Sequence, residues 1–252
     1  MAVNTRPYQK VGAQLKQQLT DGHYVIGDRF PPEREIAAHL NVSRTVVREA
    51  IIMLELEELI EVRMGSGTYV LNLPNQIKGK APKVKFSDVG PFEMLQARQL
   101  LESNIAEFAA VQVTPSDIIK MRNALELEKQ ELANQYIESE GDKNFHLYIA
   151  EATQNSVLVE MFKFSWGMRE SSAMWSALHT RINTIDYRRE WLTDHEKILS
   201  ALQRKDSISA KNAMWQHLEN VKNILFELSD TEDPDFDGYL FSSNPVVHLN
   251  QR

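Results

Sequence analysis

Two arginines one helical turn apart have the type and spacing to bind a nucleic acid. Arg44 and Arg48 follow Ser43, whose hydroxyl can accept a free backbone N–H at the start of a helix. Arginine can bind guanine or a phosphate through two parallel N–H donors, and the N-terminal residues of a recognition helix reach the base edges. The helix face with Arg44, Thr45 and Arg48 is therefore expected to contact DNA. A small helical hairpin with a solvated charged face is the alternative interpretation.

A second set of residues, far along the chain, has the chemistry of a metal site. Asp142 and His146 are four residues apart and would project from the same face of one helix, while His195 and His217 belong to later helical segments. Three imidazoles and one carboxylate suit a divalent ion, with zinc as the first choice and nickel or manganese as alternatives. Spacing alone does not decide whether the segments converge. Histidines that cap helices or form ordinary hydrogen bonds are the alternative interpretation.

A cation on a neighbouring segment could accompany such a metal. Arg98 and Glu102 are four residues apart on a predicted helix. On a surface, this pair would contribute only a few tenths of a kcal/mol; if the same face points into a bundle, Arg98 becomes a buried cation for a carboxylate ligand. Asn155 and Trp175 are further candidates for the ligand pocket, with a helix-end asparagine and a core aromatic residue as the alternatives. The predicted ligand-binding residues are thus Arg98, Asn155 and Trp175.

The elements that would position the two arginines form a predicted helix-turn-helix. Their helix carries an apolar stripe on its other side, at the spacing i, i+3, i+4 and i+7 from Val47. The segment from Pro31 to Leu40 is a preceding short helix, joined to it by a tight turn at Asn41. An earlier amphipathic helix is predicted over Tyr8–Asp21, where apolar residues repeat every fourth position. This is the layout of a DNA reader.

Two β-prone runs follow these helices. Residues 59–71 read LIEVRMGSGTYVL, and glycines between such runs are typical of a hairpin. A hairpin directly after a helix-turn-helix is a wing, which can lay its tip along the phosphates or into the minor groove. We expect Arg34 and Ser43 to anchor the DNA backbone and Gly65 to let the wing approach. The predicted DNA-contacting residues are Arg34, Ser43, Arg44, Thr45, Arg48 and Gly65.

The composition limits the class and the location of the protein. Among 252 residues cysteine is absent, so we expect no disulfide scaffold, thiolate metal site or cysteine nucleophile, and the cytoplasm is the expected location. No run approaches the roughly 18 apolar residues of a membrane span. The net charge is −7, and residues 1–70 hold eight Lys and Arg against nine Asp and Glu. DNA binding must therefore rely on the placement of charge, with a marked salt dependence from few phosphate contacts.

The chain divides into four predicted regions. Residues 1–71 form the winged helix-turn-helix, and residues 72–90 form a linker without periodicity that contains Pro, Gly and four lysines. Residues 91–228 form an all-helical antiparallel bundle for effector and metal, with a single helix expected over Val157–Trp175. Residues 229–252 are a tail that is first acidic and then aromatic. The predicted fold class is therefore mainly α.

The first 70 residues resemble the winged helix-turn-helix of the GntR superfamily of transcription regulators. That family has a PxERELA…LxVSRxxVREAL core followed by a GxGxxV wing, and the chain has PPEREIAAHLNVSRTVVREAI and GSGTYV. Two positions depart from the pattern. Glu58 stands where the family commonly has glycine, and Met64 replaces a polar or basic wing residue. The resemblance implies a DNA-binding regulator.

Residues 91–228 resemble the all-helical ligand-binding domain, of the FCD type, in the FadR subgroup of this superfamily. In many members an Asp, a His four residues on and two further His ligate a metal in the bundle core. The resemblance implies this role for the aspartate and three histidines named above. It also implies that Arg98, near the start of the domain, meets an acidic ligand.

Over its full length the chain is similar to the hexuronate-pathway repressors of the UxuR and ExuR type, and more so to UxuR. The segments that carry this similarity are QARQLLESNIAEFAA, MWQHLENVK and, in the tail, DFDGYLF. The resemblance implies a homodimer, a near-palindromic double-stranded DNA operator and a sugar-acid effector such as glucuronate or fructuronate.

The combined prediction is a ligand-responsive transcriptional repressor that a sugar acid releases from its operator. One alternative is a regulator with the same DNA reader that responds to a hydroxy acid or an acyl-CoA. Another is a metal-dependent sugar-acid enzyme with Glu151 or Glu196 near the metal. The sequence contains no HExxH or paired-carboxylate signature that would favour the enzyme.

Overall fold

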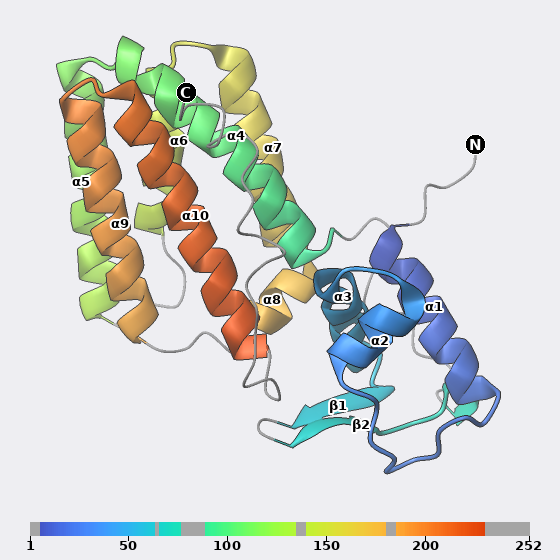
Figure 1. Ribbon diagram of the computed structural model, residues 1–252. Helices are drawn as coiled ribbons and strands as arrows, with labels where there is room; N and C mark the ends of the chain where they lie inside the picture. Colours follow the sequence, from blue (N-terminus) through green and yellow to red (C-terminus); the bar gives the residue numbers. More distant parts are fainter. Residues whose placement is uncertain (1–5, 64–65, 77–88, 135–139, 180–184, 230–252) are drawn as a thin grey trace. The chain divides into compact units, whose positions relative to one another are not determined.

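The structure is a computed structural model that describes residues 6–63, 66–76, 89–134, 140–179 and 185–229 (Figure 1). Its described residues form two compact units. The first unit takes them from 1–92, 172–178 and 227–252, and the second unit from 93–171 and 179–226. No helix in the described ranges combines the length and the hydropathy that a membrane span needs. The predicted mainly α fold, a winged helix-turn-helix followed by helices alone, is confirmed.

The first unit is built around an amphipathic helix that the periodicity of the sequence predicts. Helix α1 spans Pro7–Thr20 and has proline at its first position, where the missing N–H has no partner in any helix. Its buried face is apolar and packs against helix α3, Arg44–Leu56. The side chains on that face with at most 2% exposure are Tyr8, Val11, Leu15 and Leu19.

The turn between helices α2 and α3 depends on two polar residues. Helix α2, Glu33–Leu40, ends at Asn41, which has a φ of 52°; asparagine tolerates this left-handed region better than most residues. Ser43 then caps α3, because its hydroxyl accepts the backbone N–H of Val46 at 3.3 Å. The apolar stripe of α3, from Val47 to Leu54, is buried as expected.

The predicted wing is an antiparallel hairpin. Strands β1, Ile60–Arg63, and β2, Gly67–Val70, pair so that Ile60 lies opposite Val70, and both of these side chains are buried. The turn before β1 has Glu58 at a φ of 62°, which is the conformation that the family glycine would adopt without strain. Met64 and Gly65 lie outside the described residues, and a short 3-10 helix, η1, follows the hairpin at Pro74–Gln76.

The predicted linker and tail fall largely outside the described residues, at 77–88 and 230–252. After residue 88, a hydrogen bond joins helix α3 to the start of helix α4. The Glu49 carboxylate on α3 accepts the backbone N–H of Phe92, in the first turn of α4, at 3.1 Å. A Cβ on Gly90 would lie 2.2 Å from the Glu49 carboxyl carbon, so any other residue at this position would displace the carboxylate. Glu49, Gly90 and Phe92 all belong to the first unit.

The second unit is made of helices whose polar starts are visible in the sequence. Thr114 and Asp117 form a reciprocal capping box at the start of α5. Helix α6 packs on α5 and α7, and α5 packs on α9. The helices from the start of the bundle onward are α4 (Pro91–Gln112), α5 (Pro115–Ala133), α6 (Glu140–Ala152), α7 (Ser156–Ser171), α8 (Ala173–His179), α9 (Ile185–Gln203) and α10 (Ser207–Ser229).

The single helix predicted over Val157–Trp175 is wrong, because the chain forms two helices there. Helix α7 ends at Ser171, and α8 begins at Ala173. Ser172 separates them: its hydroxyl accepts the backbone N–H of Trp175 at 3.1 Å, the bond by which a serine starts a new helix. The apolar periodicity of the sequence continues across Ser172, so the periodicity does not reveal the break between the two helices.

Candidate functional site

The predicted DNA-contacting residues on the helix-turn-helix differ in their exposure. Arg34 is exposed on α2, and Arg44 is half-buried at the first position of α3. Thr45, beside it, is 9% exposed, and its hydroxyl oxygen lies 3.0 Å from that of Ser43. Gly65 lies outside the described residues. Arg34 thus belongs to α2, Ser43 to the turn and Arg44 and Thr45 to the first turn of α3, while Arg48 lies one turn later.

Arg48 differs from the sequence prediction, because its side chain is buried. It is 1% exposed, and its Nε donates to the two carboxylate oxygens of Glu33 at 3.0 and 2.9 Å, while Nη2 donates at 2.5 Å. A projection of α3 alone puts Arg48 on the polar face but does not include α2, whose first residue is Glu33. The arginine that was expected to face DNA therefore joins α3 to α2.

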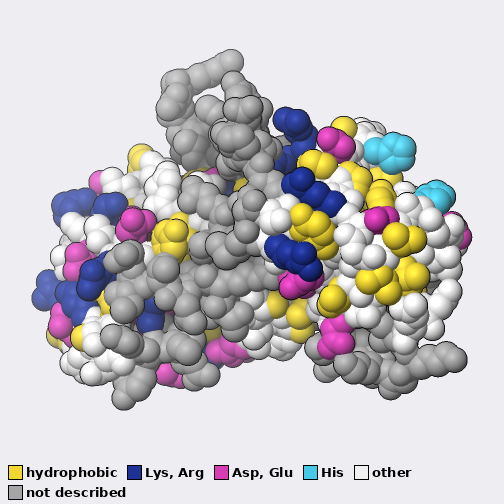
Figure 2. Space-filling model, turned by 90° about the horizontal axis from the view of Figure 1, so that it is seen from below, with side chains coloured by type: hydrophobic (Ala, Val, Ile, Leu, Met, Phe, Trp, Pro, Cys, Tyr) yellow, Lys and Arg dark blue, Asp and Glu magenta, His cyan; other side chains and the backbone are white. Residues whose placement is uncertain are grey.

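The surface charge agrees with the expectation that DNA binding depends on where positive charges lie rather than on an excess of them. On the face shown in Figure 2, groups of Lys and Arg side chains lie next to Asp and Glu side chains. A protein with this charge pattern has few sites for phosphate, so each well-placed arginine matters more.

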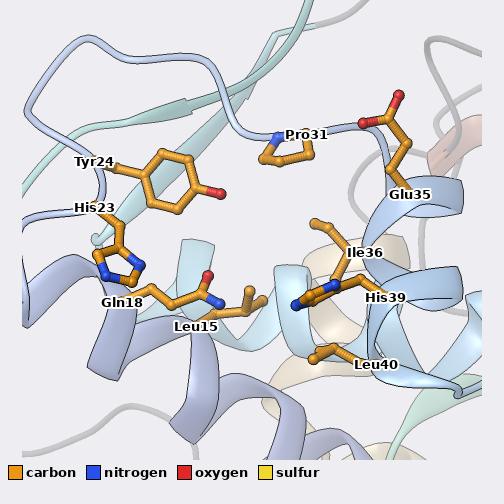
Figure 3. A pocket seen from close by; sticks show the side chains of 9 residues that line it. All are labelled: Leu15, Gln18, His23, Tyr24, Pro31, Glu35, Ile36, His39 and Leu40. Carbon is orange, nitrogen blue, oxygen red and sulfur yellow. The ribbon is translucent and has the colours of Figure 1, made fainter.

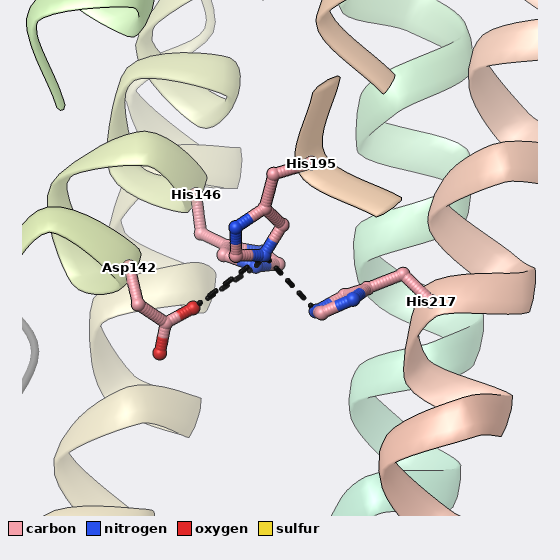
Figure 4. Close-up of side chains that lie close together, drawn as sticks. All are labelled: Asp142, His146, His195 and His217. Carbon is pink, nitrogen blue, oxygen red and sulfur yellow. Dashed lines mark hydrogen bonds and ion pairs between the residues drawn. The ribbon is translucent and has the colours of Figure 1, made fainter. Parts of the chain in front are cut away.

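The aspartate and the three histidines converge in the second unit (Figure 4). Asp142 and His146 project from α6, His195 from α9 and His217 from α10, and one potential ligand atom of each lies within 4.8 Å of all the others. The three imidazoles are at most 3% exposed, whereas the Asp142 side chain is 19% exposed. Residues separated by 75 positions in the sequence thus meet in one buried cluster.

The distances within the cluster suit a divalent ion. His195 Nε2 lies 3.2 Å from Nε2 of both His146 and His217. Asp142 Oδ1 lies 3.5 Å from His146 Nε2 and 3.7 Å from His195 Nε2. Ligand atoms at about 2.0–2.1 Å from a tetrahedral zinc are about 3.3 Å apart. The distances within these four pairs therefore fit the donor set of such an ion.

The hydrogen bonds on the far side of the imidazoles point to the same conclusion. His146 Nδ1 lies 2.6 Å from Glu102 Oε2, and His195 Nδ1 lies 2.8 Å from Glu128 Oε2. A neutral imidazole has one N–H, and a carboxylate accepts but cannot donate. When both rings are neutral and their Nδ1–H groups are directed at carboxylates, the two Nε2 atoms have lone pairs that face each other. A cation between them would remove this repulsion.

The electrostatics of the cluster keep its carboxylates charged. Burial alone would raise the pKa of Glu102, but Arg98 and His146 lower it to about 2. Desolvation likewise opposes ionisation of Asp142, and the Arg169 guanidinium and nearby imidazoles outweigh it and lower its pKa. Both carboxylates therefore remain negative at neutral pH, as metal binding requires.

The pKa values of two of the three histidines are shifted in opposite directions. Burial, followed by the neighbouring His195, lowers the pKa of His217 to about 3, so this imidazole is neutral at pH 7. Burial also disfavours the charged form of His195, but Glu128 outweighs it and raises the pKa. His217 Nδ1 is 3.9 Å from Asp194 Oδ2, and among the described residues it has no hydrogen-bond partner.

Two arginines lie on the indole ring of Trp166 near the cluster. Arg98 is 3% exposed, and its guanidinium carbon is 4.8 Å from the ring centroid; that of Arg169 is 4.3 Å away. Arg169 Nη1 also lies 3.4 Å from Asp142 Oδ2. The prediction that Arg98 is a buried cation is consistent with this placement, whereas Trp166 and Arg169 were missed because no sequence spacing links α7 to Asp142.

The other two predicted ligand residues lie elsewhere. Asn155 is exposed and caps α7, because its side-chain oxygen accepts the backbone N–H groups of Val157 and Leu158. It lies between α6, which ends at Ala152, and α7, which begins at Ser156. Trp175 is 7% exposed on α8, within the first unit. The structure does not bring Asn155 into the cluster or Trp175 into the unit that contains it.

The first unit also has an open pocket, of about 330 Å³, between α1, α2 and the loop that joins them (Figure 3). Its apolar side comes from Leu15, Ile36 and Leu40. Its other lining residues are Gln18, His23, Tyr24, Pro31, Glu35 and His39. None of the predicted DNA-contacting residues lines this pocket.

Comparison with known proteins gives matches over nearly the whole chain. A model described as "Bacterial regulatory proteins, gntR family" matches residues 7–70, and a model of the FCD domain matches residues 93–220. The chain is 54% identical over 242 residues to the "Uxu operon regulator" of Haemophilus influenzae, covering 96% of this chain and 90% of that protein.

Two proteins of Escherichia coli K12 are similar to the same extent. The "Uxu operon transcriptional regulator" is 56% identical over 244 residues, which cover 96% of this chain and 95% of the relative. The "Exu regulon transcriptional regulator" is 50% identical over 249 residues, which cover 97% and 95%. Each of these relatives is matched over both parts of its chain, the DNA reader and the helical bundle.

Proposed function

Because the chain belongs to the GntR family of bacterial transcription regulators and carries an FCD domain, we propose that it represses genes of hexuronate catabolism in the cytoplasm. A sugar acid, glucuronate or fructuronate, releases it from its operator. The chain is a DNA-binding regulator and not an enzyme. The observation that carries the effector part of the proposal is the meeting of three imidazole Nε2 atoms with the Asp142 carboxylate.

The proposed division of labour follows the sequence regions. Residues 1–71 bind DNA, residues 72–90 link, residues 91–228 bind metal and effector, and residues 229–252 form a tail. A homodimer would place two recognition helices in successive major grooves of a near-palindromic operator, about 34 Å apart. Pairing two readers compensates for the lack of net positive charge in residues 1–70.

Within each DNA reader, the arginines have different proposed tasks. Arg44 and Thr45, at the start of α3, would reach base edges. Arg34, Ser43 and Gly65 would contact the DNA backbone. Arg48 would bind a phosphate only if its ion pair with Glu33 broke. Within that buried pair it sets the position of α2 against α3.

The metal site would be formed by Asp142, His146, His195 and His217, with zinc as the expected ion and nickel or manganese as alternatives. When bound, the ion supplies a positive charge that attracts the carboxylate and hydroxyl oxygens of a sugar acid. Asp142 is the more exposed member of the set, so a ligand would approach from its side, where Arg169 also lies.

Arg98 is the proposed partner of the effector carboxylate. It lies in the same unit, buried on the ring of Trp166. To release DNA, the effector must bind more tightly to the conformation that does not bind the operator, and each tenfold difference in affinity contributes about 1.4 kcal/mol. A hydroxy acid or an acyl-CoA is the alternative effector.

The proposal is tested by fluorescence anisotropy on a DNA fragment from upstream of hexuronate catabolism genes. Glucuronate or fructuronate should release the protein at concentrations where gluconate does not, and chelation of the metal should abolish the response. Elemental analysis should find about one divalent ion per chain in wild type and none in His195→Ala. Binding that no sugar acid affects, or full metal content in His195→Ala, would reject the corresponding part.

A further inference from the structure

One buried carboxylate contacts both a proposed metal ligand and the proposed effector-binding arginine. Glu102, on α4, is 2% exposed, and its Oε2 lies 2.6 Å from His146 Nδ1. Arg98 Nε donates to Oε1 at 2.5 Å and Arg98 Nη2 lies 3.4 Å from Oε2. Resting on the function proposed above, we propose that Glu102 is a positioning residue for both partners, so that metal affinity and effector affinity depend on the same side chain.

The contact with His146 determines which ring nitrogen is available to a metal. Because the Glu102 carboxylate can only accept, the imidazole N–H must be on Nδ1, and the lone pair of Nε2 faces His195 and Asp142. A carboxylate in this position also fixes the orientation of the ring and raises its strength as a donor. Glu102 therefore acts on the metal through His146 without touching it.

The contact with Arg98 determines how the guanidinium is presented. Its plane is held on one side by the Trp166 ring, at 4.8 Å, and at its Nε edge by Glu102. An arginine has five N–H donors, so it can keep this carboxylate and still bind a second one. A guanidinium held in this way loses little freedom when the effector carboxylate arrives. Without Glu102, Arg98 would be a buried cation lacking this orientation.

Glu128 provides a matched comparison within the same cluster. It is 5% exposed on α5 and lies 2.8 Å from His195 Nδ1, so it should position His195 as Glu102 positions His146. In the described contacts it binds no arginine. Glu107 is a control on α4: it pairs with Lys211 and contacts neither imidazole in the described structure.

The test measures two affinities in four proteins: wild type, Glu102→Gln, Glu128→Gln and Glu107→Gln. Zinc affinity is measured by competition with a chromophoric chelator, and glucuronate affinity by calorimetry at saturating zinc. Both Glu102→Gln and Glu128→Gln should weaken zinc binding by about 10- to 100-fold. Only Glu102→Gln should also weaken glucuronate binding, by about tenfold. Glu107→Gln should match wild type in both.

Any other pattern overturns the inference. Wild-type zinc affinity in Glu102→Gln would remove its role toward His146, and equal glucuronate affinities in Glu102→Gln and Glu128→Gln would remove its role toward Arg98. Failure of the proposed function looks different, because then the wild-type protein itself would not bind zinc or glucuronate.

A measurement on the wild-type protein keeps the inference testable if Glu102→Gln does not fold. In zinc-loaded protein labelled with ¹⁵N-histidine, His146 should have its proton on Nδ1 and its Nε2 on the metal. Glucuronate should then shift the His146 Nδ1 resonance more than that of His195, because only His146 shares its carboxylate with Arg98. A metal-bound Nδ1 on His146, or equal shifts at the two histidines, would contradict it.

Discussion

We predict that Arg48→Met lowers the free energy of unfolding of the helix-turn-helix by about 2–4 kcal/mol. Arg48 is 1% exposed and Glu33 has a side-chain exposure of 16%, and their three contacts span 2.5–3.0 Å. Removing one partner of a buried pair costs about 3–5 kcal/mol, because the other charge stays uncompensated. Partial hydration of Glu33 and the apolar methionine reduce that figure.

The assay is hydrogen exchange of the α3 amides in the full-length protein. All four tryptophans lie at position 166 or later, so their fluorescence would not isolate the helix-turn-helix. A loss of 2–4 kcal/mol corresponds to exchange that is about 30- to 1000-fold faster. Arg44→Met is the matched control, since Arg44 is half-buried on the same helix. The double variant Glu33→Leu with Arg48→Met should recover most of the loss, because it removes both charges.

Unchanged exchange of the α3 amides in Arg48→Met would refute this reasoning. Arg48 would then contribute nothing to stability through its contacts with Glu33. Faster exchange in Arg44→Met by the same factor would also refute it, because the effect would then follow from any arginine on α3 rather than from the buried pair.

Three further predictions concern DNA, the wing and the metal. Arg44→Ala should weaken operator binding by about 1–3 kcal/mol in anisotropy titrations at fixed salt, and unchanged affinity would exclude a base contact. Glu58→Gly should stabilise the wing by up to about 1 kcal/mol in hydrogen exchange, because Glu58 has a φ of 62°; a loss would contradict this. The raised pKa of His195 predicts that zinc affinity falls about tenfold per pH unit below that pKa, and equilibrium dialysis giving the same affinity at pH 7.5 and 5.5 would disprove it.

The local signals in the sequence were sufficient for the elements of the DNA reader. These signals are Asn41, Ser43 and the apolar positions of α3. Each depends on residues within one or two helical turns, so a pattern in the sequence is enough to predict it. Arg48 could not be placed in the same way, because its burial depends on Glu33, 15 residues earlier on another helix. Projection of a single helix describes its faces but not what covers them.

The cluster in the second unit shows the same limit at longer range. The Asp142 and His146 pair is visible as an i, i+4 spacing, but its meeting with His195 and His217 depends on how α6, α9 and α10 pack. Glu128 is 67 residues from its histidine, and no periodicity connects the two. Asn155 was predicted to bind the ligand from its residue type alone, whereas its side chain accepts backbone N–H groups and caps a helix.

The bond from Glu49 to the first turn of α4 bears on how such regulators can be recombined. Glu49 lies within the recognition helix, yet the N–H that it accepts belongs to Phe92, beyond the predicted linker. A chimera cut between residues 71 and 91 would set Glu49 against the first turn of a foreign α4, where a residue other than glycine at position 90 would crowd the carboxylate. An exchange that carries residues 1–92 together, with glycine retained at position 90, keeps the contact intact. The transferable module is therefore longer than the DNA reader itself.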